Sequence, residues 1–333
     1  MSANIKDVAK YAKVSTATVS NVITGKKYVS PNLQEKVNEA IKELNYRPSK
    51  LARSLKIKKT FQIGLMVPDI TNPYFAEIAR GVEEETLKND YQLFLCNTDG
   101  VPLREEDTIK LFLDHRVDGI ISVAPRMSEK KINGFSNNVP TVVVDRHLIS
   151  TNPFIDIIYT NNYKGSYILA DHLISKNHKR FFCVAGPKNV HSSRRRLAGF
   201  VERVREDPDL SIKVVFGRFK FEDGYNLMND LLKTNFCPTA VFAGNDMMAW
   251  GVLEAIKEKN IKIPDDIAVA GFDNIYFCKY LVPSLTTIHQ PKYEAGAIAM
   301  RTLLKKIDAI KHQKKIINKN LELEPELIIR EST

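Results

Sequence analysis

The sequence has 333 residues, enough for one or two domains and a small module, and its 44% hydrophobic and 26% charged residues exclude wholesale disorder. No apolar run approaches the roughly 20 residues that cross a bilayer, and the N-terminus lacks a secretory h-region. The four cysteines show no CxxC spacing. We therefore expect a cytoplasmic protein that has no membrane partner, metal, cofactor or disulfide framework. The net charge of +10 is concentrated in the first 60 residues, which hold 13 Lys and Arg against 4 Asp and Glu; charge alone favours a nucleic-acid partner and a solvated lysine-rich surface equally.

The first 25 residues predict two short helices joined by a tight turn. Asn4 and Asp7 occupy the two positions of a capping box, which starts a helix. Ser15 is a second N-cap and opens a helix over residues 16–23, which Gly25 ends. This pattern predicts a helix-turn-helix, whose second helix can enter the major groove of DNA.

A third helix is predicted to begin with the cap Ser30 and with Pro31 at the first helical position. Apolar residues follow it at the spacing of a buried helix face. Three helices in about 46 residues bury too small a core to be comfortably stable alone. We therefore expect the module of residues 1–47 to gain stability from DNA or from the larger domain.

Residues 5–12 (IKDVAKYA) and 14–23 (VSTATVSNVI) resemble the helix-turn-helix of the LacI/GalR family of bacterial repressors, and residues 46–55 resemble the hinge of that family. The resemblance extends through the rest of the chain. One departure is Lys13, where the family often has glycine or asparagine. If the turn requires a positive φ, lysine costs on the order of 1 kcal/mol there.

The second helix carries five candidate contacts to double-stranded operator DNA. Thr16, Ala17 and Asn21 match base-contacting positions of the family. Their groups suit a base edge, a thymine methyl and an adenine, respectively. Thr18 and Ser20 suit phosphate oxygens. Helix capping is the competing interpretation for Thr16 and Thr18, and a solvated polar face is the one for Asn21.

The predicted hinge and linker span residues 48–60. Residues 49–56 are too few for a stable isolated helix, since marginal helices need about 12–15 residues, so we expect the hinge to fold only when two copies pack together on DNA. In the family, the residue matching Leu55 wedges into the minor groove and kinks the duplex. The alternative is that Leu55 packs on the core of its own module. The candidate DNA contacts of the hinge are Ser49, Arg53, Leu55 and Lys56.

From Phe61 onward, short apolar runs alternate with helical stretches. The predicted strands are residues 62–67, 92–96, 119–123, 141–144, 180–184, 239–242 and 267–270, and the predicted helices include residues 74–88, 163–175, 197–205 and 247–258. Such an alternation predicts an α/β fold with two doubly wound parallel-sheet lobes and ligand sites beyond the carboxyl ends of the strands. The family resemblance likewise implies a periplasmic-binding-protein-like pair of lobes within residues 61–333. Lobe one would span about 61–160 and 289–320, and lobe two about 161–288 and 321–333.

Polar and aromatic residues gather where the predicted strands end. Their carboxylate, amide and guanidinium groups supply the paired donors and acceptors that sugar hydroxyls require, and the aromatic rings can sandwich a sugar. For any single polar residue, helix capping is the alternative. The candidate effector-binding residues are Asp69, Tyr74, Phe75, Asp145, Arg146, Arg196, Phe219, Asn245, Asp273 and Gln290. By resemblance, Arg196, Asn245, Asp273 and Gln290 fall on effector-contacting positions of the family.

The resemblance also bears on the effector. The pair Asp145-Arg146 looks like that of ribose-binding relatives, and the whole chain resembles ribose-operon repressors. The purine-responsive branch has an arginine where this chain has Val190, which argues against a purine corepressor. The sequence therefore predicts a homodimeric repressor of a sugar-utilisation operon, controlled by a small sugar such as ribose. Other pentoses, fructose-like sugars and a protein coeffector, as in the catabolite-control branch, stay open.

An enzyme and a transport binding protein are the other classes to weigh. The sequence has no phosphate-binding loop, no G-x-G-x-x-G and no nucleophile elbow, which argues against a sugar-using α/β enzyme. We interpret His191, Ser192 and Ser193 as a loop and His289 as a structural histidine. The missing secretory signal and the basic N-terminal module argue against a transport binding protein.

Overall fold

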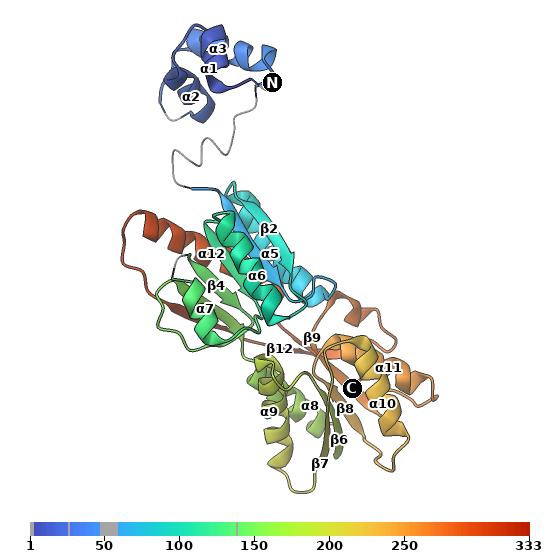
Figure 1. Ribbon diagram of the computed structural model, residues 1–333. Coiled ribbons are helices and arrows are strands. Elements are labelled where there is room, and N and C mark those ends of the chain that lie inside the picture. Colours follow the sequence, from blue (N-terminus) through green and yellow to red (C-terminus); the bar gives the residue numbers. More distant parts are fainter. Residues whose placement is uncertain (1–2, 26, 47–58, 138) are drawn as a thin grey trace. The chain divides into compact units, whose positions relative to one another are not determined.

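The computed structural model describes residues 3–25, 27–46, 59–137 and 139–333. The chain divides into two compact units, Met1–Thr60 and Phe61–Thr333, each of which we describe by itself (Figure 1). The hinge residues expected to contact DNA, Ser49, Arg53, Leu55 and Lys56, lie outside the described residues. In the described parts, no helix has both the length and the apolar character that crossing a bilayer requires.

The first unit contains α1 (Ile5–Tyr11), α2 (Thr16–Thr24) and α3 (Pro31–Glu43). The capping box at the start of α1 is confirmed, because the Asn4 side chain accepts from the N3 amide while the Asp7 side chain accepts from the amide of Asn4. Ser15 caps α2 by accepting from the amide of Thr18, and Gly25 ends that helix in the left-handed conformation.

The turn between α1 and α2 has the backbone geometry that glycine favours. Lys13 adopts a φ of 53°, so this lysine bears the conformational cost anticipated from the sequence. The three helices close over a small core in which Val8, Val19, Val37 and Ala40 are fully or almost fully buried.

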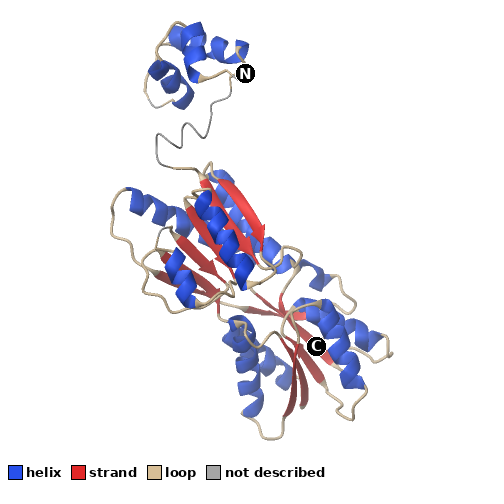
Figure 2. Cartoon of the chain, in the orientation of Figure 1, coloured by secondary structure: helices blue, strands red, loops and turns tan. Residues whose placement is uncertain are grey.

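The second unit is built on two six-stranded sheets flanked by helices (Figure 2). The order of the first sheet is β11-β5-β4-β3-β1-β2, and that of the second is β12-β10-β9-β8-β6-β7. All neighbouring strands run parallel except β12, which is antiparallel to β10. The predicted α/β class, a helix-turn-helix module followed by two parallel-sheet lobes, is confirmed.

The strands of the first sheet are β1 (Gln62–Val67), β2 (Gln92–Asn97), β3 (Gly119–Val123), β4 (Thr141–Val144), β5 (Ile155–Thr160) and β11 (Lys319–Leu323). Those of the second are β6 (Arg180–Ala185), β7 (Ser211–Phe216), β8 (Ala240–Ala243), β9 (Ala268–Asp273), β10 (Thr286–His289) and β12 (Glu326–Ile328). The helices of lobe one are α5 (Pro73–Lys88), α6 (Pro102–Asp114), α7 (Glu129–Phe135) and α12 (Lys292–Lys311). Lobe two has α8 (Asn162–Ser175), α9 (His191–Arg205), α10 (Phe221–Leu232), α11 (Asp246–Lys257) and the 3-10 helix η1 (Tyr276–Lys279).

The chain passes between the two sheets three times, after β5, after β10 and after β11. The last passage follows Leu323, three residues beyond the predicted lobe boundary at 320, because residues 319–323 pair with β5 of the first sheet. His289 is still part of β10 in the second sheet, so lobe one resumes only after it.

One predicted element differs clearly from the structure. The helix expected to begin at Leu197 begins at His191, so Ser192 and Ser193 lie in its first turn and not in a loop. The sequence hid this start because the N-cap position holds Val190, whose side chain forms no capping hydrogen bond. With this start, the N-terminus of α9 lies at the cavity between the two lobes, where Val190 and Ser192 form part of the wall.

Candidate functional site

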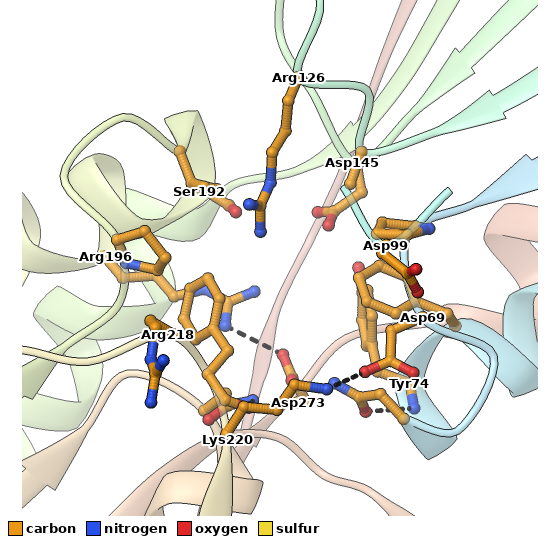
Figure 3. A pocket seen from close by; sticks show the side chains of 18 of the residues that line it. Asp69, Tyr74, Asp99, Arg126, Asp145, Ser192, Arg196, Arg218, Lys220 and Asp273 are labelled. Atoms are coloured by element: carbon orange, nitrogen blue, oxygen red, sulfur yellow. Dashed lines mark hydrogen bonds and ion pairs between the residues drawn. The ribbon is translucent and has the colours of Figure 1, made fainter. Parts of the chain in front are cut away.

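A cavity of about 610 Å³ lies between the two lobes of the second unit (Figure 3). Its walls come from segments that follow the carboxyl ends of strands in both sheets, as expected for parallel sheets. Eight of the predicted effector-binding residues line it: Asp69, Tyr74, Phe75, Asp145, Arg196, Phe219, Asn245 and Asp273. The two that do not are Arg146 and Gln290.

A buried ion pair forms the floor of the cavity on the side of lobe two. Arg196, on α9, is only 4% exposed, and its Nη1 lies 3.0 Å from Oδ1 of Asp273. Its Nε donates to the side chain of Asn162, and its Nη1 donates to the carbonyl of Gly244, both at 2.7 Å. The guanidinium also lies over the ring of Phe272, 4.0 Å from its centroid. These contacts hold the guanidinium of Arg196 in one orientation before a ligand binds.

Gln290 acts one layer behind the cavity wall. Its Nε2 donates to Oδ1 of Asp273 at 2.7 Å, and its Oε1 accepts from the phenol of Tyr74 at 3.3 Å. Lys292 donates to the backbone carbonyl of Asp273 at 2.9 Å. Gln290 therefore connects Asp273 on lobe two with Tyr74 on lobe one, and it orients both.

Asp145 is the polar group of this site whose hydrogen bonding is least complete. It is 6% exposed, and its Oδ1 is buried with no hydrogen-bond partner among the described residues. Burial raises the pKa of Asp145 to about 7, while the charge of Arg196 opposes this rise and that of Asp273 adds to it. A buried carboxyl oxygen without a partner costs on the order of 1–3 kcal/mol. A ligand that donates a hydrogen bond here would recover that energy.

Aromatic rings enclose the cavity from both lobes. Tyr74 and Phe75 come from the start of α5, with ring centroids 5.1 Å apart in an edge-to-face arrangement. Phe219 comes from the segment between β7 and α10 and packs against Gly186, where a Cβ would lie 2.1 Å from its ring. Burial and the charge of Asp145 raise the pKa of Tyr74, so its phenol stays protonated. The cavity thus combines a polar floor with apolar walls.

The two remaining candidates already have partners. Asn245 caps α11 by accepting from the amide of Met248, and its Nδ2 donates to the carbonyl of Phe219 at 3.2 Å. Asp69 accepts from Thr71 and forms an ion pair with Lys220 of the other lobe. Asn245 therefore caps α11 and also lines the cavity, where it can contact a ligand.

The structure does not bring Arg146 into the main cavity. Its Nη1 donates to the backbone carbonyls of Pro125 and Met127 at 2.6 and 2.7 Å. Arg146 therefore supports the loop after β3. That loop carries Arg126, which lines the cavity together with Ser192, and neither residue was among those predicted to bind the ligand. The rule that sites lie beyond strand ends would have found Arg126, since β3 was predicted correctly.

The cavity also gathers residues in the left-handed backbone region. Ala124, Asp145, Phe219 and Asp273 have φ values of 44°, 58°, 70° and 118°. Non-glycine residues in sparsely populated backbone regions cost of order 1–3 kcal/mol each, and such strain concentrates at functional sites. Four such residues around one cavity support its assignment as the ligand site.

The candidate DNA contacts of the first unit lie on α2. Thr16 and Ala17 are exposed near the start of the helix, and Ser20 and Asn21 are half-buried further along. The hydroxyl of Thr18 lies 2.9 Å from that of Ser15, and its amide donates to the same atom, so Thr18 takes part in the cap. These positions are compatible with the predicted contacts.

Two family models match the chain. Residues 4–49 match the model for bacterial regulatory proteins of the lacI family, and residues 170–333 match that for a periplasmic binding protein-like domain. The HTH-type transcriptional repressor PurR of Histophilus somni (strain 2336) is 40% identical over 335 residues, which cover 99% of this chain and 98% of the relative. This relative is named PurR, so it does not support the expected similarity to ribose-operon repressors.

Two solved structures are similar as well. The lac repressor dimer bound to operator and the anti-inducer ONPF gives a TM-score of 0.87 at 26% identity, covering 100% of this chain and 99% of that one. A LacI family transcriptional regulator from Enterococcus faecium with bound ribose gives a TM-score of 0.72 at 31% identity, covering 82% of this chain and 98% of that one.

Proposed function

Because this chain belongs to the LacI family and is a DNA-binding transcriptional repressor with a ligand-binding domain, not an enzyme, we propose that a small sugar, ribose, controls its affinity for operator DNA. The observation that carries the proposal is the cavity between the lobes. There, a buried arginine–carboxylate pair and a carboxyl oxygen without a partner among the described residues face aromatic rings.

The chemistry of these groups favours a polyhydroxylated ligand. Each sugar hydroxyl both donates and accepts a hydrogen bond, so neighbouring hydroxyls can satisfy a carboxylate and a guanidinium at once. Asp145 and Asp273 would accept from hydroxyls, whereas Arg196 would donate to them. The rings of Phe75 and Phe219 would cover the apolar faces of the sugar. The Enterococcus faecium relative, with its bound ribose, supports this assignment.

A purine base is the second candidate effector. The 40% identity to a repressor named PurR favours it. The apolar Val190 in the cavity wall disfavours it, because the family resemblance implies an arginine at that position in the purine-responsive branch. The two effectors are told apart by direct binding.

We further propose that the protein acts as a homodimer that reads a near-palindromic operator with two copies of α2. The lac repressor dimer on operator DNA supports this arrangement. Lobe two also exposes large side chains around η1, with Tyr276, Tyr280 and Val282 at 57%, 59% and 83% exposure. Such a patch is typical of a surface that another protein covers. Ligand binding between the lobes would then be coupled reciprocally to operator binding.

Isothermal titration calorimetry of the purified full chain with D-ribose, guanine and hypoxanthine tests the effector. We expect saturable binding of ribose, and we expect Asp273→Asn to abolish it, because the amide cannot balance the buried charge of Arg196. The exposed Asp265→Asn serves as the control. Selection from a random duplex library, followed by fluorescence anisotropy with and without ribose, tests the control of operator affinity. Binding of a purine but not of ribose would reject the sugar assignment.

A further inference from the structure

A smaller side pocket of about 90 Å³ adjoins the ligand cavity. The two share Arg126, Asp145, Val190 and Ser192 as wall residues, so a ligand in the main cavity can reach into the side pocket. Since a water molecule takes about 30 Å³ in the liquid, this space suits a group of a few heavy atoms.

The wall from lobe one presents a positioned arginine. The buried carboxylate of Glu105 accepts from the amides of Arg126 and Met127 at 2.8 Å, and Arg146 donates to carbonyls on either side of Arg126. The backbone of Arg126 is therefore fixed from both sides. Its guanidinium packs on Gly100, where a Cβ would lie 2.8 Å from the guanidinium carbon.

No hydrogen bond or ion pair of the Arg126 guanidinium is found among the described residues. Figure 3 shows this guanidinium pointing into the cavity, between Ser192 and Asp145. By contrast, the neighbouring cations Arg218 and Lys220 are paired with Asp223 and Asp69. Among the described cations that line the main cavity, Arg196, Arg218 and Lys220 each have a carboxylate partner, so the guanidinium of Arg126 is the one that remains available to a ligand.

The wall from lobe two adds further donors. The helix α9 begins at His191, and its N-cap Val190 provides no side-chain acceptor for the first-turn amides. Ser192 is 5% exposed, lines both the cavity and the side pocket, and has no hydrogen-bond partner for its hydroxyl in the described structure. A buried polar hydroxyl and free helix amides on one wall form a ready anion site.

The side pocket is lined by more cationic than acidic side chains. Its wall contains Arg126, Arg146 and Arg194 together with the acidic Glu129 and Asp145, and the buried carboxylate of Glu105 lies behind the wall, bound to the backbone amides of Arg126 and Met127. Burial, and then the nearby His147 and arginines, lower the pKa of His191 to about 4. Burial is the largest cause of this shift, and the contributions of the arginines act in the direction expected near a cationic wall.

Building on the proposed sugar effector, we propose that this protein binds a phosphorylated pentose and that the side pocket holds its phosphate group. Arg126 supplies charge-assisted hydrogen bonds from lobe one, while Ser192 and the N-terminus of α9 supply donors from lobe two. The sugar ring occupies the main cavity beside Asp145 and Arg196. A phosphate bound in this way joins the two lobes, so it also favours the closed arrangement.

Calorimetry on the full chain with D-ribose, D-ribose 5-phosphate, D-ribose 1-phosphate and inorganic phosphate tests the proposal. We expect at least one of the two phosphate esters to bind tenfold or more tightly than ribose. In Arg126→Ala and Arg126→Gln this preference ratio falls at least tenfold. Arg205→Ala, which removes an exposed arginine from the end of α9 that is far from the side pocket, keeps the ratio.

The outcomes separate this proposal from the proposed function. If ribose binds and neither ester binds more tightly, the phosphate site is refuted and the sugar effector stands. If neither ribose nor the esters bind, both are refuted. Equal loss of ribose and ester affinity in Arg126→Ala, with melting temperature retained, leaves the ratio unchanged and refutes the role of Arg126. Binding of inorganic phosphate as tightly as the esters would show that the pocket does not recognise a sugar phosphate.

Discussion

The replacement Asp145→Asn is expected to stabilise the protein while it weakens ligand binding. Burial raises the pKa of Asp145 from 3.8 to about 7, so the folded state holds its proton more tightly than the unfolded chain does. A shift of about 3 pKa units corresponds to about 4 kcal/mol, since each unit is worth about 1.36 kcal/mol. The wild-type protein bears this full cost above pH 7, where the buried carboxyl must ionise.

Because the pKa of Asp145 is higher in the folded state than in the unfolded chain, its effect on stability changes only between these two pKa values. Below about pH 3.8 the carboxyl is protonated in both states, and its shifted pKa costs nothing. Between pH 3.8 and 7 the wild-type protein loses stability as the pH rises. Asparagine has the shape of the protonated acid and does not titrate, so the advantage of the variant should grow through this window and level off above it. The variant would thus gain stability by losing a carboxyl group that serves ligand binding.

Thermal unfolding between pH 5 and 9 measures the effect, with the fluorescence of Trp250 as the probe of the second unit, because it is the single tryptophan of the sequence. At pH 8 an advantage of about 4 kcal/mol corresponds to a rise in Tm of about 8 °C, taking about 2 °C per kcal/mol for a unit of this size. The exposed Asp265→Asn should change Tm by less than about 1 °C. A variant that is no more stable than the wild type at pH 8, or whose advantage is the same at every pH, would refute this reasoning.

Three further outcomes follow from the geometry. Lys13→Gly should stabilise the helix-turn-helix unit by about 1 kcal/mol, because lysine adopts a left-handed φ there; slower amide exchange in α1 and α2 would show it, and a loss of stability would contradict it. Lys220→Ala should weaken ligand affinity up to about fivefold in calorimetry, because it removes an ion pair with Asp69 across the lobes; unchanged affinity would show that the pair does not stabilise the closed state. Asn21→Ala should cost about 1–3 kcal/mol of operator affinity in anisotropy while binding to random duplex stays the same, and an equal loss on both would indicate a phosphate contact instead.

Local signals in the sequence were sufficient for much of the fold. The strands at residues 62–67, 119–123 and 141–144 were predicted with their observed bounds, because each is a short run made mostly of apolar residues. β5 (Ile155–Thr160) was not predicted. It contains the buried Asp156, whose Oδ1 lies 2.8 Å from Nζ of Lys306 on α12. Because Lys306 is about 150 residues away in the sequence, no local pattern reveals that this carboxylate has a partner.

The candidate site shows the same division. Residues directly after a strand, such as Asp145 and Asp273, could be placed at the cavity from chain order alone. Arg146 could not be assigned correctly, because its carbonyl partners lie about 20 residues away and only the folded loop presents them. Ser192 was missed for a related reason, since its helix starts without a capping side chain.

The left-handed residues around the cavity limit how this protein can acquire a new ligand. A β-branched residue in place of Asp145 or Asp273 would have to adopt a φ of 58° or 118°, which such residues rarely tolerate. Many substitutions at these strained positions would therefore impair folding, whatever their effect on ligand binding. Val190 and Ser192 have ordinary backbone geometry, so diversification within this scaffold should accumulate there first.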